Sequence, residues 1–254
     1  MGSDEIVMDT VFKIALYGDS LAMPRKAIVK YHERYIYLIQ EWIKENRSPE
    51  YIELKDKAKG SVTILDMLEQ YEHDSGYFEF PADMLILQSG VVDCAPRPVA
   101  PQTREKISRM PSFIKKTAIK YLHRNRSRIL QKGNAHVRVE RELFFNSVKQ
   151  FLQRAVSDYK RIYVINICPT NEKTEQHSPG FTANINAYNA LLKKAIGETG
   201  SNNVFLVDIN KFINDRYTEI DNYILKEDGH HLTPLGNKLI AGEIIPKEKT
   251  YLKN

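Results

Sequence analysis

The stretch VFKIALYGDSLAMPR, residues 11–25, joins an apolar run to a turn made of Gly18, Asp19 and Ser20. The run from Val11 to Tyr17 has the length and composition of a buried β-strand, and a glycine ends it. Short Asp and Ser side chains also cap the free N–H groups at a helix start, so a structural role alone explains this turn. A chemical role for Ser20 needs partner residues elsewhere in the chain.

Similar apolar runs recur along the chain and alternate with helical patterns. The runs predict strands at 51–54, 84–88, 162–167 and 204–209. Apolar spacings of three and four predict helices at 28–43, 62–71 and 185–196, with the aromatic stripe Tyr31, Tyr35 and Trp42 in the core. Strands that alternate with helices favour a mostly parallel sheet covered on both faces. The sequence therefore predicts an α/β fold in a single domain, residues 1–254.

Positive charge is concentrated in one segment. Between Arg104 and Arg141 there are twelve Lys or Arg and two acidic residues, so this segment carries +10 and the rest of the chain −5. No strand-like run occurs there, and three prolines in CAPRPVAPQ, residues 94–102, precede it. We expect a basic, mainly helical insertion at about 98–160 that faces an anionic partner. Nucleic acid is disfavoured, because no nucleic-acid-binding motif accompanies the charge and the aromatic spacing is poor for base stacking.

Composition also limits the class of protein. No stretch approaches the roughly 18 consecutive apolar residues of a membrane-spanning helix, and residues 1–10 lack the pattern of a secretion signal. Cys94 and Cys168 each end an apolar run, which favours packed, reduced thiols over a disulfide framework. We therefore expect a cytoplasmic protein. Met1-Gly2-Ser3 resembles an added leader, which leaves a removed targeting segment as the alternative.

A partner for Ser20 stands near the other end of the chain, in EDGHHLTPLGN, residues 227–237. Asp228 and His231 lie three residues apart on a turn that Gly229 allows, before a helix that opens near Pro234. A carboxylate this close can fix the tautomer of the imidazole, and the oriented imidazole can take the proton of a serine hydroxyl. Both motifs follow apolar runs that would end at the same edge of a parallel sheet.

With these two motifs the chain resembles the GDSL esterases, or SGNH hydrolases. The resemblance implies a three-layer flavodoxin-like fold, Ser20 as nucleophile, His231 as general base and acid, and Asp228 as the orienting carboxylate. The segment AKGSVT, residues 58–63, is similar to the second block of the family, which implies that Ser20 and Gly60 supply backbone N–H groups to the oxyanion. His230 falls one position too early for the spacing and receives no catalytic role.

The third block of the family departs from its pattern here. The family has Gly-x-Asn-Asp, whereas this chain has GVVD, residues 90–93, with Val92 at the position of the oxyanion-binding Asn. Valine cannot donate a hydrogen bond, and the loss of one oxyanion donor costs on the order of 100- to 1000-fold in rate. Arg97 is a candidate substitute or substrate anchor, and Asp93 is a second candidate substrate-binding residue with a plain alternative as a loop-stabilising side chain.

The sequence thus predicts a serine-dependent hydrolase of acyl esters, or an acyltransferase that uses the same acyl-enzyme. The expected substrate is an O-acylated glycan or another small ester, with an acidic group as one option. We expect neither a metal nor an organic cofactor. The alternative is a binding protein on the same scaffold, in which Val92 marks weakened catalysis and the basic segment is the functional surface.

Overall fold

The computed structural model describes residues 11–25, 28–47, 49–74, 82–133, 135–216 and 220–251. The strands in these ranges are β1 (Val11–Gly18), β2 (Tyr51–Asp56), β3 (Ala82–Gln88), β4 (Tyr159–Ile165) and β5 (Val204–Val207). They pair in parallel in the order β2-β1-β3-β4-β5. Because the central strands are buried on both faces, they consist almost entirely of apolar residues.

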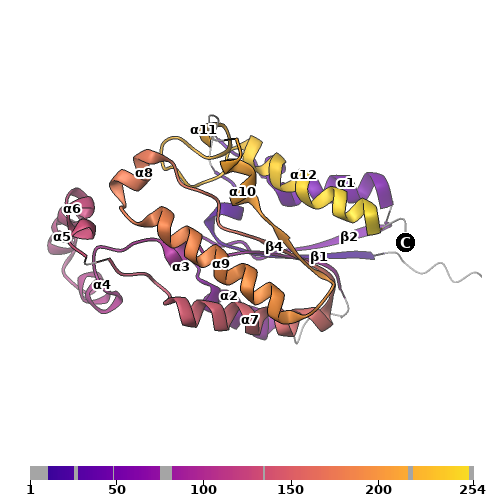
Figure 1. The fold of residues 1–254 in the computed structure, drawn as a ribbon, viewed down its shortest axis with the longest axis horizontal. Helices are drawn as coiled ribbons and strands as arrows, with labels where there is room; N and C mark the ends of the chain where they lie inside the picture. The colour runs from indigo at the N-terminus through magenta and orange to yellow at the C-terminus, as the bar shows by residue number, and fades with distance from the viewer. Residues whose placement is uncertain are drawn as a thin grey trace, which may run out of the picture.

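Helices cover both faces of the sheet (Figure 1). One face carries α1 (Tyr35–Arg47) and α12 (Pro234–Tyr251), which pack against each other. The other carries α2 (Ile64–Asp74), α7 (Arg141–Asp158) and α9 (Phe181–Thr199), with α7 packed between the other two. The predicted α/β class and its three-layer arrangement are therefore confirmed. None of the helices that the structure describes is long and apolar enough to cross a membrane.

Short elements at the carboxyl ends of the strands form the edge where a parallel sheet binds its ligands. They are the 3₁₀ helix η1 (Ser20–Ala22) after β1, α3 (Val91–Cys94) after β3, α8 (Glu172–His177) after β4, and α10 (Ile209–Asn214) and α11 (Ile220–Tyr223) after β5. The strand order reverses beside β1, because β2 lies on one side of it and β3 on the other. The turn that carries Ser20 leaves the sheet at this switch point.

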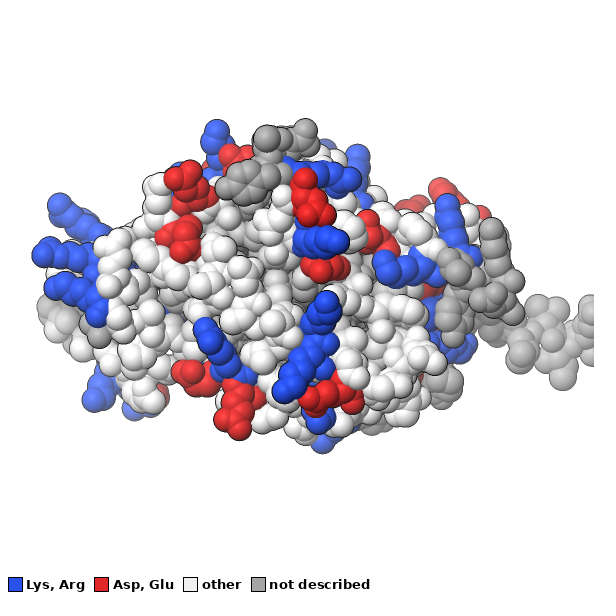
Figure 2. Space-filling model, viewed as in Figure 1, with Lys and Arg blue, Asp and Glu red and all other residues white. Residues whose placement is uncertain are grey.

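The stretch expected as one insertion, 98–160, divides into two parts in the structure. Its second part, α7, covers the sheet, and its apolar face is buried in the core. Its first part holds α4 (Pro101–Ser108), α5 (Ser112–Arg124) and α6 (Arg126–Gln131), which project at one end of the molecule (Figure 1). An antiparallel bridge between Arg97 and His136 closes the base of this projection. Figure 2 shows Lys and Arg gathered over it.

The first predicted helix begins later than its apolar spacing indicated. Residues 31–33 form the 3₁₀ helix η2 (Tyr31–Glu33), and the backbone at Arg34 is extended before α1 starts at Tyr35. Tyr31 is 56% exposed and packs on Tyr37, so its place in the aromatic core stripe was wrong. Tyr35 is fully buried and Trp42 packs partly buried against the core.

Two further expectations are refined by local capping and by burial. The last strand stops at Val207, because the Asp208 carboxylate accepts the Lys211 N–H and starts α10. Cys94 and Cys168 are buried free thiols, as the apolar runs before them indicated. The expectation about residues 1–10 lies outside the described residues.

Candidate active site

The turn after β1 holds Ser20 at the edge of the sheet. Asp19 is fully buried, and its Oδ1 accepts the Leu21 N–H at 2.9 Å, which caps η1. Gly18 is required for close packing, because a Cβ there would lie 2.6 Å from the Cβ of Ala22. Burial raises the pKa of the Asp19 carboxyl to about 7, against the hydrogen bonds that stabilise its ionised form. The strand, the glycine and the cap together fix the direction of the serine side chain.

The turn before α12 brings the acid and the imidazole together. Asp228 Oδ1 accepts the backbone N–H of His231 at 3.1 Å, and Asp228 Oδ2 lies 2.9 Å from His231 Nδ1. Gly229 has φ of 65°, a left-handed conformation that favours glycine. Its carbonyl accepts the Asn171 N–H and the Thr170 hydroxyl, so the loop after β4 holds this turn in place.

The two motifs meet although 211 positions separate them. His231 Nε2 lies 3.0 Å from Ser20 Oγ, and the ring is 7% exposed. With Asp228 on Nδ1, the proton of the neutral imidazole sits on that nitrogen and Nε2 is free to accept the serine proton. The sequence predicted that these residues lie together, and a hydroxyl, an imidazole and a carboxylate hydrogen-bonded in this order can act as nucleophile, base and orienting acid.

Electrostatics keep the acid ionised. Burial alone would raise the pKa of the Asp228 carboxyl, but the hydrogen bond and charge of His231, with a smaller effect of His230, lower it well below its usual value. Arg25 contributes a further cation 3.8 Å from Asp228 Oδ2. Burial, followed by the charge of His231, lowers the pKa of His230 to about 4, so His230 is neutral at pH 7.

A cleft of about 670 Å³ opens over Ser20, and several chain segments contribute to it. Gly60, Ser61, Val91 and Val92 line it beside the serine. Within the described part of the chain, the backbone N–H groups of Ser20 and Gly60 donate to no protein acceptor. Two free N–H groups that border the same cleft as a nucleophile can receive the negative charge of an acyl-transfer intermediate.

The structure separates the other two sequence candidates. Arg97 lines the cleft together with Ser20. Asp93 does not line it: its side chain is fully buried, and its Oδ1 accepts the Ile64 N–H at 3.0 Å, at the start of α2. Asp93 therefore caps the start of α2 rather than stabilising its own loop, and its assignment to substrate binding was wrong, because the side chain does not reach the cleft. Val92 is at the cleft as its position in the third block indicated, and its side chain offers no donor there.

Several residues of the cleft were not singled out from the sequence. Arg25 follows η1, and Lys173, His177 and Ser178 belong to the loop and helix after β4. The sequence could have indicated Lys173, His177 and Ser178, because the segment after a parallel strand reaches the edge of the sheet where ligands bind. No periodicity or motif marks the individual residues, so only the folded chain identifies them.

One group of side chains has the composition of a metal site. Asp228, His230 and His231 place ligand atoms within 4.8 Å of one another. Both ring nitrogens of His231 already serve the hydrogen bonds to Asp228 and Ser20, and Nδ1 of His230 lies 2.8 Å from the Asp228 carbonyl oxygen. The arrangement in this structure is suited to proton transfer between Ser20 and His231.

Comparison with known proteins gives matches in structure only. No protein-family model and no curated protein matches the sequence. A lipase/acylhydrolase from Enterococcus faecalis has a TM-score of 0.63 and 13% identity, over 94% of this chain and 96% of that one. A G-D-S-L family lipolytic protein from Veillonella parvula has a TM-score of 0.59 and 12% identity, over 92% and 97%. An acetyl xylan esterase has a TM-score of 0.59 and 20% identity, over 93% and 99%.

These matches cover nearly the whole of each chain, which includes the sheet and both helical layers. At identities of 12 to 20% they establish the fold and leave the chemistry to the site itself. The chain therefore has the three-layer α/β fold of the GDSL-type lipolytic proteins and acetyl xylan esterases, as its first and last motifs predicted.

Proposed function

We propose that this protein hydrolyses acyl esters through an acyl-enzyme on Ser20. The observation that carries the proposal is the chain of two hydrogen bonds, 3.0 Å from Ser20 Oγ to His231 Nε2 and 2.9 Å from His231 Nδ1 to Asp228 Oδ2, at the base of an open cleft. A serine hydroxyl is a weak nucleophile until a base takes its proton, and this arrangement supplies the base and its orienting acid.

The reaction proceeds in two transfers. Ser20 Oγ attacks the ester carbonyl as its proton passes to His231 Nε2, and the N–H groups of Ser20 and Gly60 donate to the oxyanion. His231 then gives the proton to the leaving alcohol, and the acyl group stays on Ser20. Water, deprotonated by His231, attacks this acyl-enzyme and releases the acid. An acceptor hydroxyl in place of water would make the same intermediate an O-acyltransferase.

The substrate class that we propose is a small O-acyl ester, such as an acetyl group on a sugar. One of the matched structures supports the sugar ester, because its own name describes an acetyl xylan esterase, and the lipolytic name of another supports ester hydrolysis in general. The cleft contributes a second argument: side chains with hydroxyl, imidazole and guanidinium groups line it, which suits a polar alcohol.

The experiment that tests the proposal joins covalent labelling with turnover. A fluorophosphonate should add to Ser20 with loss of fluoride, and intact-mass spectrometry should show one adduct. Ser20→Ala and His231→Ala should each lower the rate of acetate release from p-nitrophenyl acetate by at least about 10³-fold. Ser157→Ala is the control, because this exposed hydroxyl at the end of α7 contacts only its own helix end.

The contrary result is equally clear. An unlabelled wild-type protein, with the same background hydrolysis in all three variants, would contradict the proposal. It would favour the alternative of a binding protein whose third block, with Val92, has lost its oxyanion donor.

A further inference from the structure

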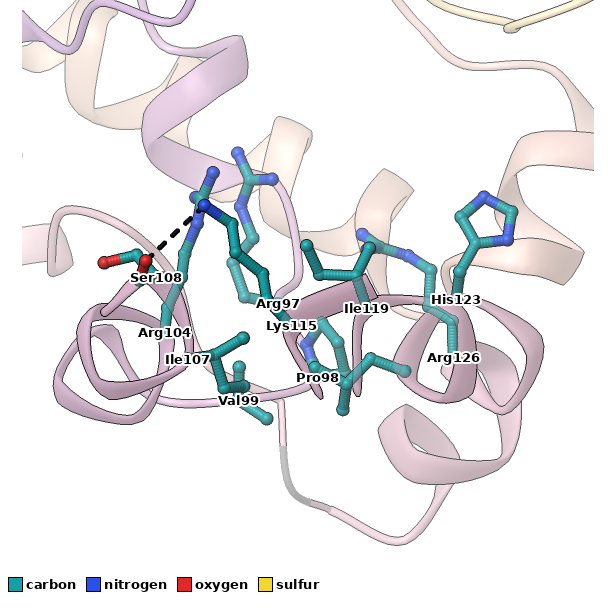
Figure 3. A pocket seen from close by; sticks show the side chains of 11 residues that line it. Arg97, Pro98, Val99, Arg104, Ile107, Ser108, Lys115, Ile119, His123 and Arg126 are labelled. Atoms are coloured by element: carbon teal, nitrogen blue, oxygen red, sulfur yellow. Dashed lines mark hydrogen bonds between the residues drawn. The ribbon is translucent and has the colours of Figure 1, made fainter. Parts of the chain in front are cut away.

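Cationic side chains gather where the cleft over Ser20 meets a second cavity. This cavity, of about 380 Å³, lies between the segment after α3 and helices α4 and α5 (Figure 3). Arg97, His123 and Arg126 line both spaces, and Arg104 and Lys115 line the second one. Figure 3 shows Arg97 and Arg104 extending to the same side of this cavity. Because the same three side chains border both spaces, a molecule bound in the cleft would lie beside the second cavity.

Among the residues that the structure describes, no ion pair joins a carboxylate to Arg97, Arg104, Lys115 or Arg126. None of the residues that line the second cavity is acidic. Arg126 donates from Nε to Ser178 Oγ at 2.7 Å and from Nη2 to the Pro96 carbonyl, both uncharged acceptors. The Nε of Arg97 is buried without a hydrogen-bond partner. Among the described residues, neither arginine forms an ion pair, so neither positive charge is compensated by a carboxylate, and only the Arg126 side chain is held by hydrogen bonds.

Holding these charges together costs free energy. Burial, followed by the charges of Arg104, Arg126 and Arg138, lowers the pKa of Arg97 to about 10. Burial also lowers the pKa of Arg126. Half-buried cations that repel one another are costly without a partner, and their persistence beside a reactive group is typical of a ligand site. A bound anion would offset this cost.

Apart from Ser108, the remaining walls of the second cavity are apolar. Its apolar lining consists of Pro98, Val99, Ile107, Ile119 and Leu122. Apolar walls with a few fixed polar groups are the usual composition of a small-molecule pocket. They can contact the carbon skeleton that carries an acidic group, whereas an extended nucleic-acid backbone needs an open, exposed track.

We propose that Arg97 and Arg126 form a subsite for a phosphate, sulfate or carboxylate group carried by the ester that Ser20 attacks. This inference rests on the proposed function and adds to it the acidic class of the substrate. The two guanidinium groups donate to the anion, and Arg104 adds to the local positive potential. Arg97 is thereby an anchor for the substrate, and the backbone N–H groups of Ser20 and Gly60 bind the oxyanion.

Only some basic residues of the projection line the proposed subsite. Arg124 and Arg128 are exposed and line neither space, although they flank Arg126 in sequence. Arg124 and Arg126 therefore form a matched pair: their substitution by glutamine removes the same charge two residues apart, and only one of them faces the ligand.

The test measures binding without turnover. In Ser20→Ala protein, isothermal calorimetry compares an O-acetyl hexose that carries a phosphate with the same hexose lacking it, and inorganic phosphate alone serves as a third probe. We expect the phosphorylated sugar to bind at least about 10-fold more tightly. Addition of Arg126→Gln should weaken this binding about 10-fold, and Arg124→Gln less than about 2-fold. Salt should weaken it as well, since the screening length falls to about 8 Å near 0.15 M.

A second variant protects the test from a misfolded Arg126→Gln protein. Arg104 is exposed and lines the same cavity, so Arg104→Gln should weaken binding by about 3-fold in a protein with an unchanged circular dichroism spectrum. Equal affinity for the two sugars, or equal effects of Arg124→Gln and Arg126→Gln, would overturn the subsite. So would single-stranded RNA that binds more tightly than the phosphorylated sugar and depends equally on both arginines.

The two proposals fail separately. If Ser20→Ala protein binds the phosphorylated sugar through Arg126 while wild-type protein releases acetate from no ester, the subsite stands and the proposed hydrolysis fails. If the wild type hydrolyses both sugars with the same KM and the same salt dependence, the hydrolysis stands and the subsite is overturned.

Discussion

At the scale of single residues, two glycines and two carboxylates decide where the reactive side chains lie. Gly18 allows η1 to pack on the end of β1, and the Asp19 carboxylate caps η1 and so fixes Ser20. Gly229 supplies the left-handed backbone that lets Asp228 turn back onto His231. These positions are specified by backbone geometry, so residues that never contact a substrate control the position of those that do.

Gly229 gives the sharpest prediction at this scale. A Cβ at this position would lie 2.1 Å from both Asn171 Oδ1 and Thr174 Oγ1, in addition to the strain at φ of 65°. Gly229→Ala should lower stability by about 2–4 kcal/mol and kcat by at least about 10-fold, because the Asp228 turn must shift. Thermal unfolding and p-nitrophenyl acetate kinetics measure the two effects.

Gly200 is the matched control for this substitution. It has φ of 63°, and a Cβ there would meet nothing within 4 Å. Gly200→Ala should therefore cost about 1 kcal/mol, for the left-handed conformation alone, with unchanged kcat. Equal loss of activity in both alanine variants would show that crowding at Asn171 and Thr174 does not position the site.

At the scale of elements, one buried arginine joins the serine turn to the scaffold. Arg34 is 1% exposed and lies between η2 and α1. Its Nε donates to the Ala22 carbonyl at 2.6 Å, and its two Nη atoms donate to the Asp56 carboxylate at 2.5 and 3.1 Å. It thereby ties η1, the end of β2 and the start of α1 together. The same contacts explain why the first helix begins at Tyr35: the extended backbone at Arg34 is needed to aim its side chain inward.

Loss of this contact should be costly. Arg34→Met leaves the Asp56 carboxylate and the Ala22 carbonyl without their donor, so we expect about 3–5 kcal/mol lower stability in urea unfolding. We also expect a lower kcat, because η1 loses its hold on the scaffold. Lys149→Met is the comparison, since the Lys149–Glu198 pair lies on the surface and should contribute less than about 1 kcal/mol. Similar losses in both variants would refute the role of Arg34 as a tie between elements.

At the scale of the whole molecule, the chain forms an apolar core around the sheet and a basic projection, α4 to α6, at one end. The projection returns to the core through the Arg97–His136 bridge, so the chain leaves and re-enters beside the cleft. This placement lets Arg97, His123 and Arg126, which follow Ser20 by 77 to 106 positions, border the same cleft. Inside the core, two carboxyl groups, Asp19 and Asp93, are fully buried and have raised pKa values of about 7.

These carboxyls make the stability of the molecule depend on pH. Burial raises the pKa of Asp93 from 3.8 to about 7, so the folded state binds this proton more tightly than the unfolded state. The stabilising contribution of the protonated form is complete below about pH 4 and is lost as the pH rises toward 7. Asp93→Asn keeps an acceptor for the Ile64 N–H and cannot ionise. As the pH rises from about 4 to 7, the variant should become more stable than wild type, by on the order of 1–3 kcal/mol above pH 7.

The pKa of Asp66, at the same start of α2, is shifted in the opposite direction. Burial acts to raise the pKa of its carboxyl, but the hydrogen bonds from the Thr63 hydroxyl and N–H outweigh this and lower it. The stabilisation that ionised Asp66 gives the folded state is complete above its pKa in the unfolded chain, about 4. It is lost as the pH falls through its lower pKa in the folded protein. Asp66→Asn should therefore be less stable than wild type at pH 7. Chemical denaturation from pH 4 to 8 measures both variants, and a pH-independent Asp93→Asn difference would contradict the argument.

The sequence by itself determined the alternation of strands and helices, and hence the parallel sheet, because buried strands and amphipathic helices are recorded in local runs and spacings. It also predicted that Ser20 pairs with Asp228 and His231, because the Asp-x-x-His spacing is local and both motifs resemble one family. The strand end expected just before Asp228 was wrong, since that turn follows α11 and an isolated bridge at Ile224. Only the tertiary structure decided that Asp93 is a buried cap, that the extended backbone at Arg34 delays the first helix to Tyr35, and that Arg126 faces the cleft while Arg124 faces solvent. Those outcomes depend on side-chain contacts between residues far apart in the chain, and on the direction in which a loop leaves the sheet, neither of which a local pattern encodes.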